Sequence, residues 1–142
     1  MQFRLIFSFS IMVIATVLCS VANAEVVVIV STKSNVTSLT IDQTARIFLG
    51  KEDKFPNAQI AIPVDQGEGT EVRDEFYSKV THKSASQLAA FWAKLIFTGE
   101  GRLPQALEDD KAVIKFVTNN PSAIGYIEEN SLTRKVRVVL KP

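Results

Sequence analysis

The chain has 142 residues, of which 46% are hydrophobic and 22% are charged, and its formal net charge is +1. This near balance of charge, without a basic block, argues against a nucleic-acid partner. A chain of this length is expected to form one domain with its own hydrophobic core.

The first 24 residues are typical of a signal peptide. Arg4 is followed by an apolar run from Leu5 to Cys19, and Ala22-Asn23-Ala24 fits a signal peptidase site. The run is short for a membrane span, which needs about 20 residues, so an uncleaved anchor is the weaker alternative. A lipoprotein is also disfavoured, because no small residue precedes Cys19. We therefore expect export to the periplasm, a chain that begins near Glu25, and no stable membrane insertion after signal removal.

The chain beyond the signal peptide offers little for catalysis or metal binding. It has no cysteine and one histidine, His82, so it has neither a zinc ligand set nor a cysteine–histidine pair. The acids Asp65, Glu68 and Glu71 lack the spacing of a calcium loop. Hydrolase and phosphate-loop motifs are absent as well. The sequence therefore predicts no enzyme activity, no cofactor and no metal.

Residues 25–142 are expected to form one α/β domain. The apolar run EVVVIVS at 25–31 is typical of a strand buried on both faces. Further strands are predicted over 60–64, 123–127 and 136–140, and helices over 41–49, 70–81, 84–98 and 107–117. Strands and helices alternate at first, which favours a mixed, mostly parallel sheet flanked by helices.

Several side chains predict where the helices begin and how they pack. Thr40 with Gln43, and Ser84 with Gln87, form two capping boxes. The helix at 41–49 should place Ile41, Ala45, Phe48 and Leu49 inward and end at Gly50. The helix that ends at Gly99 has Leu88, Phe91, Trp92, Leu95 and Ile96 at helical spacing, which is typical of core packing.

The stretch from Ile60 to Val80 reads as a strand, a glycine turn and a helix. Its turn, Gly67-Glu68-Gly69-Thr70, stands where unpaired backbone N–H groups and the helix dipole can bind an anion. In the simpler interpretation Thr70 caps the helix, the glycines supply positive φ and Glu68 faces solvent. A third possibility is that the Glu68 carboxylate occupies the turn itself.

Arg73 lies one turn into the same helix. Its guanidinium could reach over the turn and bind an anion there. Alternatively, it pairs with Glu71, Asp74 or a neighbouring surface acid, as exposed arginines commonly do.

Three segments carry a resemblance to a known family. They are 45–51 (ARIFLGK), 63–70 (PVDQGEGT) and 123–127 (AIGYI), in that order along the chain. The chain resembles the substrate-binding proteins of the phosphate ABC transporter, and in particular short, single-lobe members of their type 2 periplasmic binding protein fold. The resemblance implies phosphate held by the backbone of Gly69 and Thr70 and by the Thr70 hydroxyl.

Two positions depart from that family pattern. The family's arginine falls at Val64, and its serine falls at Glu68. The resemblance implies an exported solute-binding-like protein that binds phosphate or a related small oxyanion at Gly67, Glu68, Gly69, Thr70 and Arg73. A transporter permease or another periplasmic protein would be its partner. The alternative is a single-lobe periplasmic interaction or accessory protein that has lost ligand capture.

Overall fold

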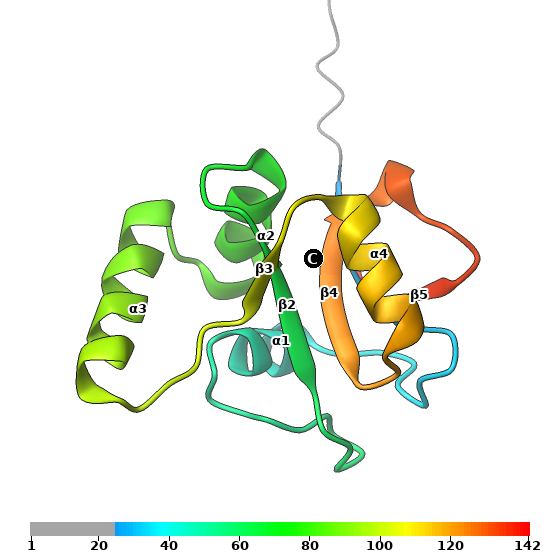
Figure 1. Cartoon of the computed structure of the whole chain (residues 1–142), viewed down its shortest axis with the longest axis horizontal. Helices are drawn as coiled ribbons and strands as arrows, with labels where there is room; N and C mark the ends of the chain where they lie inside the picture. The colour runs from blue at the N-terminus through cyan, green and yellow to red at the C-terminus, as the bar shows by residue number, and fades with distance from the viewer. Residues whose placement is uncertain (1–24) are drawn as a thin grey trace, which may run out of the picture.

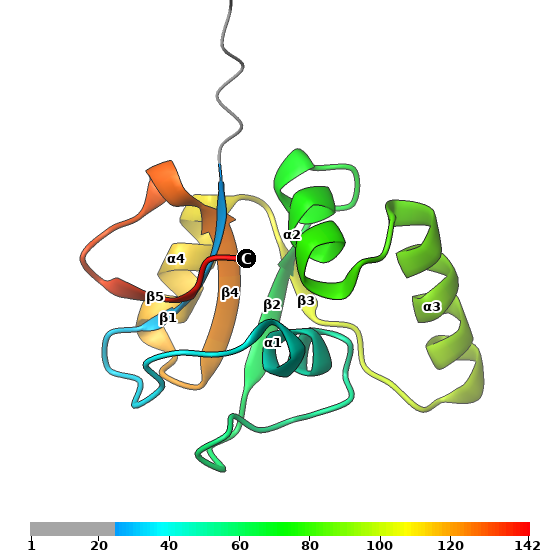
Figure 2. The same ribbon diagram turned by 180° about the vertical axis from the view of Figure 1, so that it is seen from behind.

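A computed structural model describes residues 25–142, which form one five-stranded sheet with helices on both faces (Figures 1 and 2). The predicted signal peptide, 1–24, lies outside the described residues. The strand order is β3-β2-β4-β1-β5. The strands are β1 (Val26–Ser31), β2 (Ile62–Gln66), β3 (Gln105–Leu107), β4 (Ala123–Glu128) and β5 (Val136–Leu140).

The sheet is mixed, and four of its strands run in one direction. β2 is parallel to both β3 and β4, whereas β1 is antiparallel to both β4 and β5. All six residues of β1 are buried, as its continuous apolar sequence predicts for a strand covered on both faces. The expected α/β fold with a mostly parallel sheet is therefore confirmed.

The helices cover the two faces unequally. They are α1 (Ile41–Phe48), α2 (Glu71–Thr81), α3 (Ala85–Thr98) and α4 (Asp110–Asn119), with a 3-10 turn η1 (Glu129–Ser131). α4 packs alone on one face, where Val113 and Val117 are fully buried. α1 and α2 lie on the other face, and α3 packs beyond them at the edge of the molecule (Figures 1 and 2). None of the helices formed by residues 25–142 combines the length and hydropathy of a membrane span.

Two predicted helix starts and one predicted helix end are confirmed. Thr40 and Gln43 exchange both hydrogen bonds of the first capping box, at 2.9 and 3.1 Å. Ser84 and Gln87 form the second, at 2.9 and 3.2 Å. Gly99, the residue that ends α3, has a positive φ of 70°.

Some expectations about the elements are wrong. Leu107 belongs to β3 and not to a helix, because Asp109 caps α4 by accepting from the Ala112 N–H at 2.8 Å and the helix starts after it. Ile41 is 41% exposed and Ile96 is 59% exposed, although helical spacing had placed both inward. β3 was missed because three residues show no periodicity, and only their pairing with β2 makes them a strand.

Gly125 explains the AIGYI segment. It lies on β4 beneath α4, where an added Cβ would stand 2.6 Å from Val113 Cγ1 and 3.1 Å from Val64 Cγ2. A side chain there would push α4 off the sheet. The glycine therefore sets the close approach of helix and sheet.

Candidate functional site

The predicted turn lies at the carboxyl end of β2 and leads directly into α2. Thr70 donates its backbone N–H at 3.3 Å and its hydroxyl at 2.8 Å to the carbonyl oxygen of Gly67. Gly69 adopts a φ of +83°, a conformation that favours glycine. Thr70 stands at the N-cap position as expected, but its hydroxyl donates back into the turn and does not cap the helix.

As a result α2 begins with free donors. The backbone N–H groups of Glu71, Val72 and Arg73 have no acceptor among residues 25–142. The other three α-helices each have a side-chain oxygen bound to their first turn. Free N–H groups at the positive end of the helix dipole are suited to an anion.

Glu68 is exposed at the tip of the turn. Its carboxylate accepts no hydrogen bond from any part of the chain that the structure describes. The structure therefore shows the solvent-facing glutamate of the simpler interpretation. The third possibility, that the Glu68 carboxylate occupies the turn itself, is wrong. The exposed carboxylate still adds a negative charge beside any anion that would occupy the turn.

Arg73 does not pair with a surface acid, so that alternative is wrong as well. Its side chain is 8% exposed, and its Nε donates to Oδ2 of the buried Asp65 at 3.4 Å. The guanidinium carbon lies 5.1 Å from the centre of the Tyr77 ring. Burial acts to lower the pKa of Arg73, but Asp65, together with the neighbouring Tyr77 and Tyr126, outweighs it, so the pKa lies above its ordinary value. Arg73 is thus a buried cation neutralised by Asp65.

Asp65 is the centre of a buried polar cluster that the sequence did not reveal. Its Oδ2 also accepts from the Tyr77 hydroxyl at 2.9 Å. Its Oδ1 accepts from the Gln66 N–H at 2.8 Å and from the Tyr126 hydroxyl. An acid followed by a glutamine at the end of an apolar strand was the available signal, because such polar groups are buried only when they are paired.

The cluster continues to the start of α4. Gln66 donates its side-chain amide to Asp110 Oδ1 at 2.8 Å and to the Tyr126 carbonyl at 3.0 Å. Asp110 Oδ2 accepts from the Glu128 N–H at 3.0 Å and from the Ser131 hydroxyl at 2.7 Å. One hydrogen-bonded chain therefore joins the first turns of α2 and α4 beneath the carboxyl ends of β2 and β4.

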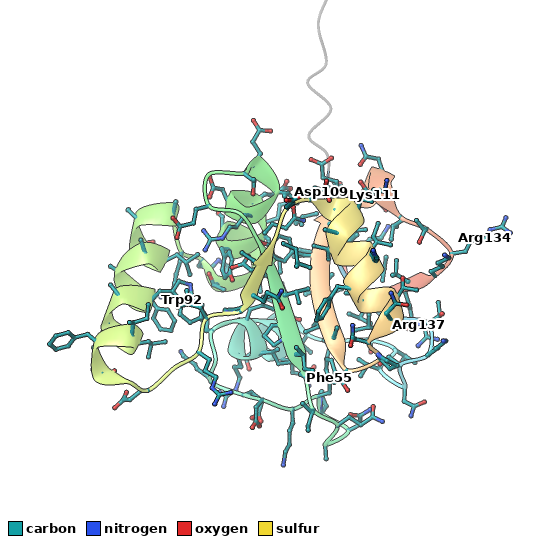
Figure 3. All side chains as sticks on the ribbon, viewed as in Figure 1. Phe55, Trp92, Asp109, Lys111, Arg134 and Arg137 are labelled. Carbon is teal, nitrogen blue, oxygen red and sulfur yellow. The ribbon has the colours of Figure 1, made fainter. Side chains whose placement is uncertain are left out.

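A shallow cavity of about 600 Å³ opens above this series of hydrogen bonds, beside Thr70. Its charged lining is strongly acidic, with the carboxylates of Glu71, Glu108, Asp109, Asp110 and Glu128 against the single ammonium of Lys111. Figure 3 shows Asp109 and Lys111 at the start of α4. Carboxylates a few ångströms from a bound anion oppose binding unless cations offset them. No group of three or more histidine, cysteine or acidic residues within 25–142 is placed to hold a metal ion.

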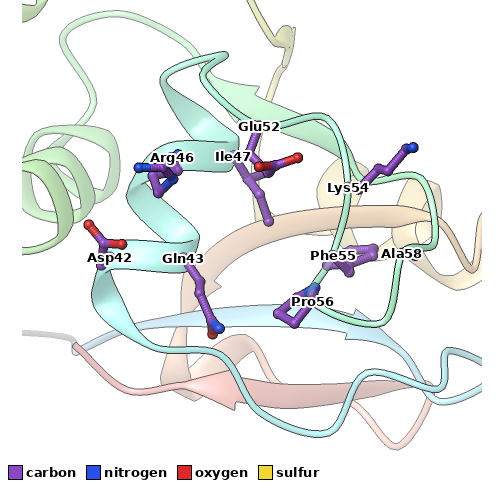
Figure 4. A pocket seen from close by; sticks show the side chains of 9 residues that line it. All are labelled: Asp42, Gln43, Arg46, Ile47, Glu52, Lys54, Phe55, Pro56 and Ala58. Atoms are coloured by element: carbon purple, nitrogen blue, oxygen red, sulfur yellow. The ribbon is translucent and has the colours of Figure 1, made fainter.

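Positive side chains lie elsewhere on the surface. Arg46 and Lys51 line a groove with His82 and Lys83, between α1 and the end of α2. Arg46 also borders a cavity of about 430 Å³ next to Phe55, where the acids Asp42 and Glu52 balance the charges of Arg46 and Lys54 (Figure 4). These grooves are separate from the Gly67–Thr70 turn, so the structure does not bring Arg46 or Lys51 to the predicted site.

No protein-family model and no curated protein sequence matches the chain. Solved structures do match. A protein from Clostridium perfringens, described as a phosphate ABC transporter substrate-binding protein with bound phosphate, has a TM-score of 0.64 and 22% identity. An ABC-type phosphate transport receptor from Vibrio cholerae has a TM-score of 0.64 and 17% identity, and PstS from Borrelia burgdorferi has 0.61 and 14%.

Each match covers 81% of this chain, which in turn spans 44%, 45% and 46% of these three structures. The chain therefore has the fold of one lobe of these solute-binding proteins. More narrowly, the fold is that of the substrate-binding proteins of phosphate ABC transporters. The resemblance found in the sequence is thereby confirmed at the level of the fold.

Proposed function

We propose that this protein is an exported, non-enzymatic accessory protein of the periplasm, built on a single solute-binding lobe that no longer captures phosphate. It acts through contacts with another protein, of which a transporter permease is one candidate. The support for this proposal is electrostatic and comes from the charge around the turn.

One observation carries the proposal. Five carboxylates and one ammonium line the cavity beside the turn, and Glu68 adds a further carboxylate at its tip. The nearest arginine, Arg73, is already neutralised by Asp65. At a separation of about 4 Å, each uncompensated like charge costs about 1–4 kcal/mol near a protein surface, so a phosphate dianion is disfavoured.

A specific observation favours a second candidate function, the binding of phosphate or a related small oxyanion at Gly67–Thr70. The N–H groups of Glu71, Val72 and Arg73 are free, and Gly69 leaves the turn open. One protein of the same fold is described with bound phosphate, and another is described as a phosphate transport receptor. If these donors outweigh the surrounding acids, the turn itself is the ligand site.

Calorimetry with inorganic phosphate separates the two functions. We expect the native protein to show no saturable heat below about 1 mM phosphate. Glu68→Ser removes the exposed charge and should bring binding into this range. Glu52→Ser, which removes an acid from a separate cavity, is the matched control and should bind as poorly as the native protein.

The outcomes are distinct. Saturable binding by the native protein that is lost in Gly69→Val, a variant strained at positive φ, would replace the accessory function with oxyanion binding. Binding that survives Gly69→Val but is lost in Lys51→Ala would place the anion in the groove between α1 and the end of α2, where Lys51 lies. Affinity purification from the periplasm should recover a transporter component if the accessory function holds.

A further inference from the structure

α3 is apolar on two sides, although only one side contacts the rest of the molecule. Leu88 and Trp92 face inward and are 1% and 4% exposed. Figure 3 labels Trp92 on this helix. The opposite side consists of exposed, uncharged residues at spacings of three and four, which follow one face of a helix. These are Ser86, Ala89, Ala90, Ala93, Ile96 and Phe97.

The outer face exposes two large side chains to solvent. Phe97 is 93% exposed and Ile96 is 59% exposed. Both views of the fold show α3 at the edge of the molecule, with no other element on its outer side (Figures 1 and 2). A contiguous exposed apolar patch of this kind marks a contact surface.

The face is self-complementary in shape. Its N-terminal half carries only small side chains, Ser86, Ala89 and Ala90, and its C-terminal half carries Ile96 and Phe97. When two copies pack antiparallel, the large end of each helix meets the small end of the other. A parallel arrangement would instead set the two Phe97 rings together and leave a gap at the alanines.

The flanking charges select the same arrangement. Lys83 precedes α3 and Glu100 follows it. Antiparallel packing brings Lys83 of one copy toward Glu100 of the other, whereas parallel packing brings like charges together. We propose that the outer face of α3 is a homodimer contact in which two copies of α3 pack antiparallel around Ala93. This inference rests on α3 alone and is independent of anion binding at the turn.

The area available limits the affinity. Each phenylalanine buries about 150–250 Å². With Ile96 and the alanines, two copies would bury roughly 800 Å² in all, which is below the 1,200–2,000 Å² of standard stable interfaces. We therefore expect a reversible dimer with a dissociation constant on the order of 100 µM.

Sedimentation velocity over a range of protein concentrations tests the dimer. Phe97→Ser and Ala93→Glu should each weaken dimerisation at least about tenfold, because one removes the large side chain and the other places a charge at the centre of the face. Ser78→Glu makes the same charge change on the exposed side of α2 and is the matched control. A native protein that is monomeric at about 1 mM, or a dimer unaffected by both variants, would overturn the proposal.

Disulfide crosslinking tests the relative orientation of the two α3 helices. The variants are made in a Cys19→Ser background, so that the introduced cysteine is the only one in the chain. In the antiparallel arrangement the two copies of residue 93 face each other, while the two copies of residue 97 stand about 12 Å apart along the helices. A disulfide requires Cα atoms within about 7 Å. Ala93→Cys should therefore crosslink to itself, and Phe97→Cys should crosslink only to Ala89→Cys. Preferential self-crosslinking of Phe97→Cys would contradict the antiparallel contact.

Discussion

Tyr126 donates its hydroxyl to the Asp65 carboxylate, which joins two residues 61 positions apart at the buried ends of β4 and β2. Asp65 also binds Tyr77 and Arg73 of α2. This single carboxylate therefore ties the sheet to the helix that follows the candidate turn. Its position determines that Arg73 serves the core and does not add positive charge to the turn.

The two tyrosines of the chain should report its unfolding in alkali. Burial, and next the negative charge of Asp65, raise the pKa of both Tyr77 and Tyr126 above the ordinary value of 10.0. Because the folded state holds these protons more tightly, the stabilisation is complete below about pH 10 and is lost as the pH rises further. The loss amounts to about 1.4 kcal/mol per pH unit for each tyrosine.

Ultraviolet absorbance of tyrosinate checks this expectation against circular dichroism. The tyrosinate signal should appear together with the loss of secondary structure. A tyrosine that ionises near pH 10 in the folded protein would contradict the burial of these two hydroxyl groups.

Asp65→Asn should destabilise the protein by about 3–5 kcal/mol, because it leaves the buried Arg73 without a counterion. Urea unfolding measures the change. Combining it with Arg73→Met removes the uncompensated charge, so the double variant should be more stable than Asp65→Asn alone. Asp42→Asn, at an exposed position, is the control and should change stability by less than about 0.5 kcal/mol. If the double variant is the less stable one, the ion pair is not what makes Asp65 important.

Gly125→Ala should cost about 1–3 kcal/mol, because its Cβ would clash with Val113 on α4. Gly67→Ala is the matched control, since no atom lies within 4 Å of its added Cβ. Chemical denaturation should show Gly67→Ala within about 0.5 kcal/mol of the native protein. Adding Val113→Ala to Gly125→Ala should cost less than the two changes summed. Strict additivity would show that the clash is relieved in another way.

Trp92→Phe should be nearly neutral, whereas Trp92→Ala should cost about 3–5 kcal/mol. The indole Nε1 of Trp92 is buried and has no hydrogen-bond partner among residues 25–142, so removing it forfeits no bond. Thermal unfolding of the two variants provides the comparison. A large loss in Trp92→Phe would reveal an acceptor for the indole that the described residues lack.

Local signals in the sequence were sufficient for several elements. The valine run at 25–31 predicted a strand buried on both faces, because only a strand covered on both sides accepts consecutive apolar residues. The Thr40 and Ser84 capping boxes predicted two helix starts, since their hydrogen bonds join residues three positions apart. The strand–turn–helix at 60–80 and the family resemblance followed from the same kind of local pattern.

The sequence by itself thus determined the α/β fold and the place of the Gly67–Thr70 turn. Only the tertiary structure decided that Arg73 is buried against Asp65, that α2 starts without a side-chain cap, and that the adjacent cavity is acidic. The reason is physical. Secondary structure depends on neighbours within a few residues, whereas the charge at a site depends on which distant side chains, such as Asp110 and Glu128, the sheet brings to the same edge.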